Sequence, residues 1–267
     1  MTVGAAITQP APPNSFSLVA VGAAAGFLSG LFGVGGGTII VPALVLWLKV
    51  PQRLATGASV AAILPAAIVG AVSYGLQGHV DWIAAGALAS GVFVGASFGS
   101  VLLARVRLAA LQWNFILFLL VVIVSLWFVV PQREDVMTLG SLQVAVLVLL
   151  GLGTGTLGGL LGVGGGVIVV PVLMFFFGAG DLVAKGTSLA MMIPGSVSGT
   201  FGNVHRSNVD LKMAAIVGLA ASALVPVGLL VATGIEPLVS NLAFSVYLSV
   251  ITGQMLVRRL RSQGTKA

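Results

Sequence analysis

The chain has 267 residues, of which 58% are hydrophobic and only 7% are charged, and its mean hydropathy is +1.16. Soluble domains carry about 25% charged residues, so this composition excludes an ordinary water-soluble protein and predicts an all-α protein that crosses a membrane several times. The net charge of +6 is typical of cytoplasmic loops and does not indicate nucleic acid as a partner. The absence of cysteine from the sequence excludes disulfides, thiolate metal sites and cysteine nucleophiles.

The first apolar stretch, residues 16–47, is interrupted by glycine. Residues 1–15 before it lack the positive region of a secretory signal, so we expect this stretch to stay in the mature protein. Its middle carries the run Gly33-Val-Gly-Gly-Gly37. Glycine weakens a helix by about 1 kcal/mol per residue relative to alanine, so this run predicts a break and a helical hairpin.

Three long apolar runs follow the hairpin. Spanning a bilayer takes about 20 apolar residues, so these runs predict membrane-spanning helices. The helices are expected near residues 54–76, 83–104 and 111–130. A polar stretch then begins at Pro131, so we assign residues 1–130 to a first half and residues 131–141 to a connecting loop.

The rest of the chain repeats the first half at a constant offset of 129 residues. Residues 26–42 and 155–171 are identical at 12 of 17 positions, and the same register pairs Ser59 with Ser188 without a gap. The repeat predicts a second half at 142–257 and a basic cytoplasmic tail at 258–267. Its hairpin is expected to break at 162–166, and its spanning helices are expected near 186–204, 213–233 and 238–257. Two homologous halves with a substrate site between them are typical of secondary transporters.

The number of crossings per half decides whether the halves are inverted or parallel. Three full crossings per half, with both termini in the cytoplasm, place 10 Lys and Arg residues inside and 2, Arg133 and Lys185, outside. If each glycine-broken stretch crosses once, the eight crossings divide these charges 7 against 5. Because cytoplasmic loops concentrate Lys and Arg, we favour an inverted repeat in which the glycine-broken hairpins are re-entrant or discontinuous.

Broken helices in a membrane indicate a binding site, because an unpaired backbone group in hydrocarbon is costly unless it lines a cavity. Helices that restart at Thr38 and Val167 would present free N–H groups and positive dipole ends, which attract anions. Hydroxyl groups in the next helix could donate to the same anion or bond to a carbonyl of their own helix, and the sequence favours neither. The candidate substrate-binding residues are Gly33, Gly35, Gly36, Gly37, Thr38, Ser59, Gly162, Gly164, Gly165, Gly166, Thr187 and Ser188.

Other small and polar residues have simpler interpretations. Six glycines have the four-residue spacing of closely packed helices: Gly22, Gly26, Gly30, Gly151, Gly155 and Gly159. Lys185 is interpreted as a solvated loop residue, and no charged residue is expected deep within a crossing. Asp81 and Asp210 are interpreted as helix caps, and His79 and His205 as surface groups that form hydrogen bonds.

The motifs in the sequence do not indicate an enzyme. Gly95-Ala-Ser-Phe-Gly99 matches the string of a nucleophile elbow, but it lies in the middle of an expected helix. The glycine runs lack the Lys-Ser/Thr of a phosphate-binding loop, and two histidines without cysteine do not supply a usual metal centre. We therefore expect no enzyme activity, no catalytic residues, no metal site and no cofactor.

The doubled signature G-x-L-x-G-L-x-G-V-G-G-G-x-I-x-V-P, at residues 26–42 and 155–171, resembles that of the TauE/SafE family, the sulfite exporters. The motif Ala-x-Gly-x-Ser at residues 55–59, with its equivalent at 184–188, is similar to the family's next motif. This resemblance implies a permease of the bacterial plasma membrane for sulfite, organosulfonates or related small anions, commonly acting in export. We expect alternating access of the two repeats. The alternative is a channel-like pore, or a carrier of carboxylates or other small nutrients.

Overall fold

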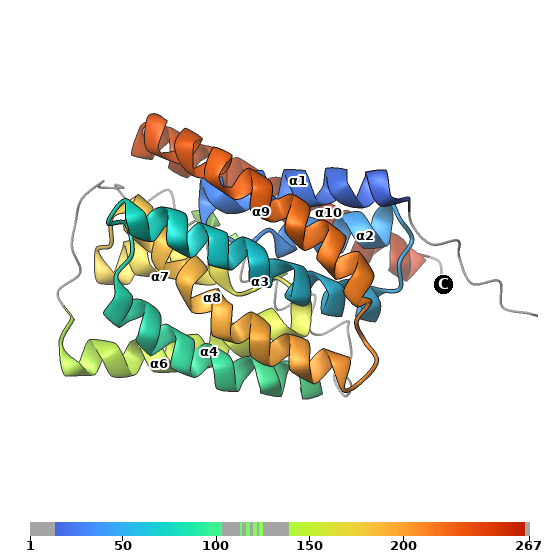
Figure 1. The fold of residues 1–267 in the computed structure, drawn as a ribbon, viewed down its shortest axis with the longest axis horizontal. Coiled ribbons are helices and arrows are strands. Elements are labelled where there is room, and N and C mark those ends of the chain that lie inside the picture. Colours follow the sequence, from blue (N-terminus) through green and yellow to red (C-terminus); the bar gives the residue numbers. More distant parts are fainter. Residues whose placement is uncertain are drawn as a thin grey trace, which may run out of the picture.

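The computed structural model describes residues 14–102 and 139–264, together with scattered positions between 113 and 124. Within these residues the fold is entirely helical (Figure 1). The helices are α1 (Ser15–Phe32), α2 (Gly37–Leu46), α3 (Gln52–Leu76), α4 (Trp82–Leu102), α6 (Ser141–Leu161), α7 (Gly166–Phe177), α8 (Asp181–Val204), α9 (Leu211–Gly234) and α10 (Pro237–Gly264). Most of the crossing expected near 111–130 and of the loop at 131–141 lies outside the described residues.

Six described helices are long and apolar enough to cross a membrane, so the chain is a multi-pass membrane protein. They are α1, α3, α4, α6, α9 and residues 237–257 of α10. The crossings expected near 54–76, 83–104, 213–233 and 238–257 correspond to four of these helices. The helix expected at 186–204 exists as α8, but it begins earlier, at Asp181, and carries two charged residues near its start.

Both glycine runs break the chain as predicted. α1 ends at Gly33 with φ +70° and α2 follows Gly36 with φ +71°, while the equivalent Gly162 and Gly165 have φ +74° and +81°. This left-handed conformation disfavours side chains, which explains why glycine is needed here. The helices restart one residue before the expected positions, at Gly37 and Gly166.

The two limbs of each hairpin have unequal lengths. α1 has 18 residues, which makes it about 27 Å long, close to the thickness of a bilayer core. α2 has 10 residues and reaches only about half as far. Each hairpin therefore combines one long and one short helix.

Helix pairs in one half have equivalents in the other. α1 packs against α9, and the equivalent pair in the repeat is α6 with α4. α9 packs against α3, and the equivalent pair is α4 with α8. The spaced glycines make these contacts close, as predicted. A Cβ added to Gly26 would lie 2.0 Å from the Ala221 carbonyl oxygen, and one added to Gly155 would lie 2.6 Å from the Val92 carbonyl oxygen. Because Val92 and Ala221 are also 129 positions apart, the halves contact each other reciprocally.

The helices α3 and α8 form the centre of this arrangement. They pack against each other and run in opposite directions (Figure 1). α3 is the most buried of the six candidate spans, with 67% of its apolar window inside the protein. The turns that follow α3 and α8 lead into capped helices. Asp81 Oδ1 accepts a hydrogen bond from the Ala84 N–H, and Asp210 Oδ1 accepts one from the Met213 N–H, which confirms both predicted caps.

Candidate functional site

The two glycine breaks touch each other in the interior. A Cβ added to Gly37 would lie 2.4 Å from the carbonyl oxygen of Gly162, and one added to Gly166 would lie 2.7 Å from that of Gly33. Real Cβ atoms do not come this close, so the contact requires glycine on both sides. The structure therefore brings the glycines predicted from the two halves to one place.

Two of the predicted hydroxyl residues hold this contact together. Ser59 Oγ on α3 donates a 2.7 Å hydrogen bond to the Gly162 carbonyl, and Ser188 Oγ on α8 donates a 2.9 Å hydrogen bond to the Gly33 carbonyl. All four residues are buried. Carbonyl groups at the end of a helix lack a donor from their own helix, and hydrocarbon offers none. Each serine thus satisfies the end of a broken helix in the opposite half, which is neither of the two roles predicted for it.

Two apolar side chains fill the space between the breaks. A Cβ added to Gly35 would lie 2.5 Å from Met192 Sδ, and one added to Gly164 would lie 3.1 Å from Ile63 Cδ1. Ile63 and Met192 are repeat equivalents, and they are 0% and 1% exposed. Among the described residues, a void beside Gly164 and Met192 has a volume of about 10 Å³, which suits about one water molecule. In the part of the chain that the structure describes, a small oxyanion does not fit between the breaks until these side chains move, so this part of the structure is closed.

Two other predicted residues point elsewhere. The Thr187 hydroxyl accepts a 3.0 Å hydrogen bond from the Asp81 N–H, at the turn between α3 and α4. The Thr38 hydroxyl forms a hydrogen bond with the Tyr247 hydroxyl of α10. The backbone of Thr38 still lies in the first turn of α2, where helical N–H groups have no partner one turn earlier.

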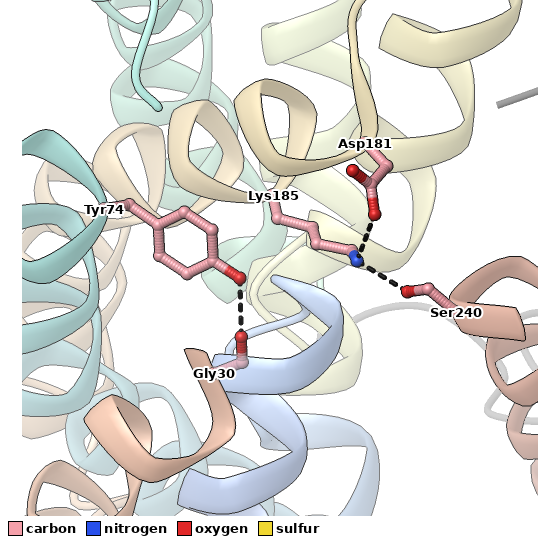
Figure 2. Close-up of polar contacts among 5 residues, drawn as sticks. All are labelled: Gly30, Tyr74, Asp181, Lys185 and Ser240. Atoms are coloured by element: carbon pink, nitrogen blue, oxygen red, sulfur yellow. Dashed lines mark hydrogen bonds and ion pairs between the residues drawn. The ribbon is translucent and has the colours of Figure 1, made fainter. Parts of the chain in front are cut away.

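The prediction for Lys185 is wrong. It lies inside α8, 3% exposed, and its Nζ donates to Asp181 Oδ2 at 2.9 Å and to Ser240 Oγ of α10 at 2.7 Å (Figure 2). Asp181, the first residue of α8, is likewise buried, 2% exposed. The spacing of four residues between an acid and a base on one helix was the signal for this pair.

A buried tyrosine near this ion pair was also not predicted from the sequence. Tyr74 is 0% exposed, and its hydroxyl donates a 2.6 Å hydrogen bond to the Gly30 carbonyl in the last turn of α1 (Figure 2). It thereby joins the end of α3 to the helix that leads into the first break. Tyr74 stabilises the position of that break.

A larger groove with a mainly apolar lining lies between α4 and α8. It has a volume of about 450 Å³. Its polar lining includes Ser97, Ser198 and Arg206, and the Arg206 guanidinium donates to Ser100 Oγ at 3.1 Å. Arg206 lies in the turn just after α8, which ends at Val204. None of its lining residues belongs to the two breaks or to the serines that bond them.

Comparisons with known proteins agree with the membrane fold. The sequence profile of the family described as "Sulfite exporter TauE/SafE" matches residues 3–129 and 147–267. The chain is 38% identical over 84 residues to the "Probable membrane transporter protein YunE" of Bacillus subtilis, covering 32% of this chain and 31% of that protein. It is 34% identical over 160 residues to a "Probable membrane transporter protein" of Haemophilus influenzae, covering 57% of this chain and 60% of that protein.

A third relative is matched over more of its length. The "Probable membrane transporter protein YdhB" of Bacillus subtilis is 27% identical over 208 residues, which cover 75% of this chain and 84% of that protein. The matches to the first two relatives span less than two thirds of their lengths. No solved structure matches the chain.

Proposed function

Because this chain belongs to the sulfite exporter TauE/SafE family of membrane transporters, we propose that it is a secondary transporter of small anions in the bacterial plasma membrane. The anions proposed first are sulfite, organosulfonates and related sulfur-containing anions. The protein is not an enzyme.

We propose that the two halves form an inverted repeat, with residues 1–130 and 142–257 as the halves, 131–141 as the connecting loop and 258–267 as a basic tail. The reciprocal helix contacts support this arrangement. So does the opposite direction of the equivalent helices α3 and α8 (Figure 1). The family profile also matches in two segments. The distribution of Lys and Arg supports a cytoplasmic position for both termini.

The contact between the two breaks is the main observation that supports the proposed site. In an inverted repeat, equivalent parts that touch lie on the axis that relates the halves, and this axis runs through the middle of the membrane. This supports a substrate site at the breaks, where alternating access needs it. The first N–H groups of α2 and α7 would bind the anion, since helix N-termini favour negative charge without a formal cation. Ser59 and Ser188 would keep the carbonyl groups of Gly162 and Gly33 occupied.

Transport through this site requires the breaks to separate. In the closed structure Ile63 and Met192 occupy the space between them. Opening toward one side would withdraw these side chains and expose the N–H groups, and closing around the anion would restore the seal. A carrier of this kind binds its substrate at a saturable site.

Flux measurements test the proposal. Purified protein in proteoliposomes should take up labelled sulfite with saturable kinetics, and unlabelled sulfite inside should accelerate this uptake by counterflow. Inhibition of this uptake by unlabelled sulfate, methanesulfonate or acetate shows which class of anion binds best. Linear uptake without counterflow would identify a pore, and a preference for acetate would identify a carboxylate carrier. If no anion of the panel moves, the chain is not the proposed transporter.

A matched pair of glycine variants locates the site. Gly36→Leu adds a side chain at φ +71°, where a Cβ would already lie 2.9 Å from the Ala25 carbonyl oxygen. Gly78→Leu adds the same side chain at φ +76° in open space. We expect Gly36→Leu to insert in the membrane but to lose transport, and Gly78→Leu to keep it. Equal transport by both variants would place the binding site away from the breaks.

A further inference from the structure

A buried ion pair lies beside the first break. Asp181 and Lys185, both nearly inaccessible, face each other one turn apart at the start of α8 (Figure 2). Lys185 Nζ also reaches Ser240 of α10. Ionisable groups inside a membrane protein are costly and usually serve transport or proton movement.

One oxygen of this pair lacks a partner. Asp181 Oδ2 accepts from Lys185, but Asp181 Oδ1 is buried without a hydrogen bond among the described residues. Buried carboxylate oxygens are nearly always satisfied, so an exception needs a reason. This oxygen is free to receive a proton.

The fold itself does not require the charges. A Cβ added to Gly33 would lie 2.6 Å from the Lys185 Cα. A Cβ added to Gly162 would lie 3.0 Å from the Cα of Thr56, the repeat equivalent of Lys185. The repeat equivalents of Asp181 and Lys185 are Gln52 and Thr56, so the second break is held by the same backbone contact without an ion pair. The charges are therefore an addition to one half of the site.

We propose that Asp181 and Lys185 form a charge switch that couples anion binding to uptake of one proton, an inference that rests on the transport function proposed above. The incoming anion replaces Asp181 as the partner of Lys185, whose side chain starts at the Gly33 break. The displaced carboxylate takes up a proton at Oδ1 and becomes neutral. The site then holds one anion, one lysine cation and one neutral acid, so its net charge is zero before and after binding. Each monovalent anion crosses with one proton, and the net movement carries no charge.

Other titratable groups lie on the elements around α8, among the described residues. They include Arg53 and Tyr74 on α3, His79 between α3 and α4, Asp81 before α4, Glu236 before α10, and Tyr247 on α10, whose hydroxyl bonds to that of Thr38. The Tyr74 hydroxyl is committed to the Gly30 carbonyl, and Asp81 caps α4. Glu236 is exposed. Asp181 is the group among them that combines burial, a cationic partner and an unpartnered oxygen.

Methanesulfonate is a suitable probe because it stays ionised at every working pH, so any proton that moves with it is carried by the protein. Proteoliposomes with an internal pH dye and a potassium diffusion potential report labelled anion, protons and charge together. For the natural sequence we expect one proton per anion and a net flux that does not respond to voltage. For Asp181→Asn we expect exchange of labelled for unlabelled anion to persist, proton movement to vanish and net flux to become voltage-dependent.

Three variants separate a charge switch from a structural role. Lys185→Met should reduce anion exchange by about tenfold or more, because the charged donor is lost. Ser240→Ala removes the contact to α10 without changing charge and should keep the proton ratio. The double variant Asp181→Asn/Lys185→Met removes both charges, should fold as the natural protein does in size-exclusion chromatography, and should show the same loss of exchange as Lys185→Met.

The outcomes distinguish the two proposals. If the natural protein exchanges neither methanesulfonate nor sulfite, the transport function fails and the charge switch fails with it. If it exchanges anion but moves no protons, or if Asp181→Asn keeps the proton ratio, the charge switch alone is wrong. Full exchange by the folded double variant would likewise show that the pair does not bind the anion.

Discussion

Two serine hydroxyls connect the halves of the protein at the level of single residues. Ser59 and Ser188 each donate to a carbonyl that ends a helix of the opposite half, at 2.7 and 2.9 Å. Neither carbonyl has a donor in its own helix, and hydrocarbon offers none. The serines are thus structural parts of the closed site.

Replacing either serine by alanine should leave one buried carbonyl unsatisfied. Such a loss costs about 1–3 kcal/mol, so we expect Ser59→Ala and Ser188→Ala to lower the unfolding temperature in detergent by similar amounts. Ser222→Ala is the matched control, because the Ser222 hydroxyl bonds to Gly218 within its own helix. Its unfolding temperature should stay nearly unchanged. A large difference between the two test variants would contradict the reciprocal arrangement.

The sequence predicted the glycine breaks and the aspartate caps because both depend on neighbouring residues. The helices break at Gly33 and Gly162 as expected, and Asp81 caps the helix that follows it. The serine partners could not be predicted, since Ser188 and Gly33 are 155 positions apart. The prediction that Lys185 is a solvated loop residue was wrong for a different reason. α8 begins at Asp181, ahead of the apolar run, so a residue assigned to a loop is buried in a helix.

At the scale of helices, α3 and α8 form the moving parts of the proposed mechanism. Their repeat-equivalent residues Ile63 and Met192 fill the space between the breaks. Two residues further along each helix are the prolines Pro65 and Pro194. Proline removes one backbone hydrogen bond and weakens the helix locally. The helices are therefore weakest beside the side chains that must withdraw.

Single cysteines can detect this withdrawal, because the natural sequence has none. Ile63→Cys and Met192→Cys should resist a membrane-impermeant thiol reagent at rest and react faster when methanesulfonate is being transported. Leu88→Cys, at a fully buried position of α4, should stay unreactive in both conditions. Equal reactivity with and without the anion would show that α3 and α8 do not open during transport.

The order of the helices was more predictable from the sequence than the shape of the hairpins. Apolar length located α3, α4, α9 and α10, since each is one continuous run. The long α1 and the short α2 share one run, and only their different packing reveals their unequal lengths. α1 lies along α9, whereas α2 is shorter and contacts α1 and α3.

At the scale of the whole molecule, the inverted repeat predicts that equivalent surface positions face opposite sides of the membrane. Gly78 and Ser207 are such a pair. They are 129 positions apart, both exposed, and both left-handed, with φ +76° and +54°, in the turns that follow α3 and α8. Their shared geometry makes them comparable reporters, because a cysteine at either site meets the same backbone constraint.

We expect Gly78→Cys to be labelled from outside intact cells by an impermeant maleimide, and Ser207→Cys only after the membrane is opened. The physical reason is the charge beside each turn. Arg206 and Lys212 flank Ser207, and cytoplasmic loops retain such residues during insertion. A parallel arrangement of the halves would place both cysteines on one side and label them alike. If Ser207→Cys is labelled from outside and Gly78→Cys only after the membrane is opened, the halves are still inverted, but both termini lie on the outer side of the membrane.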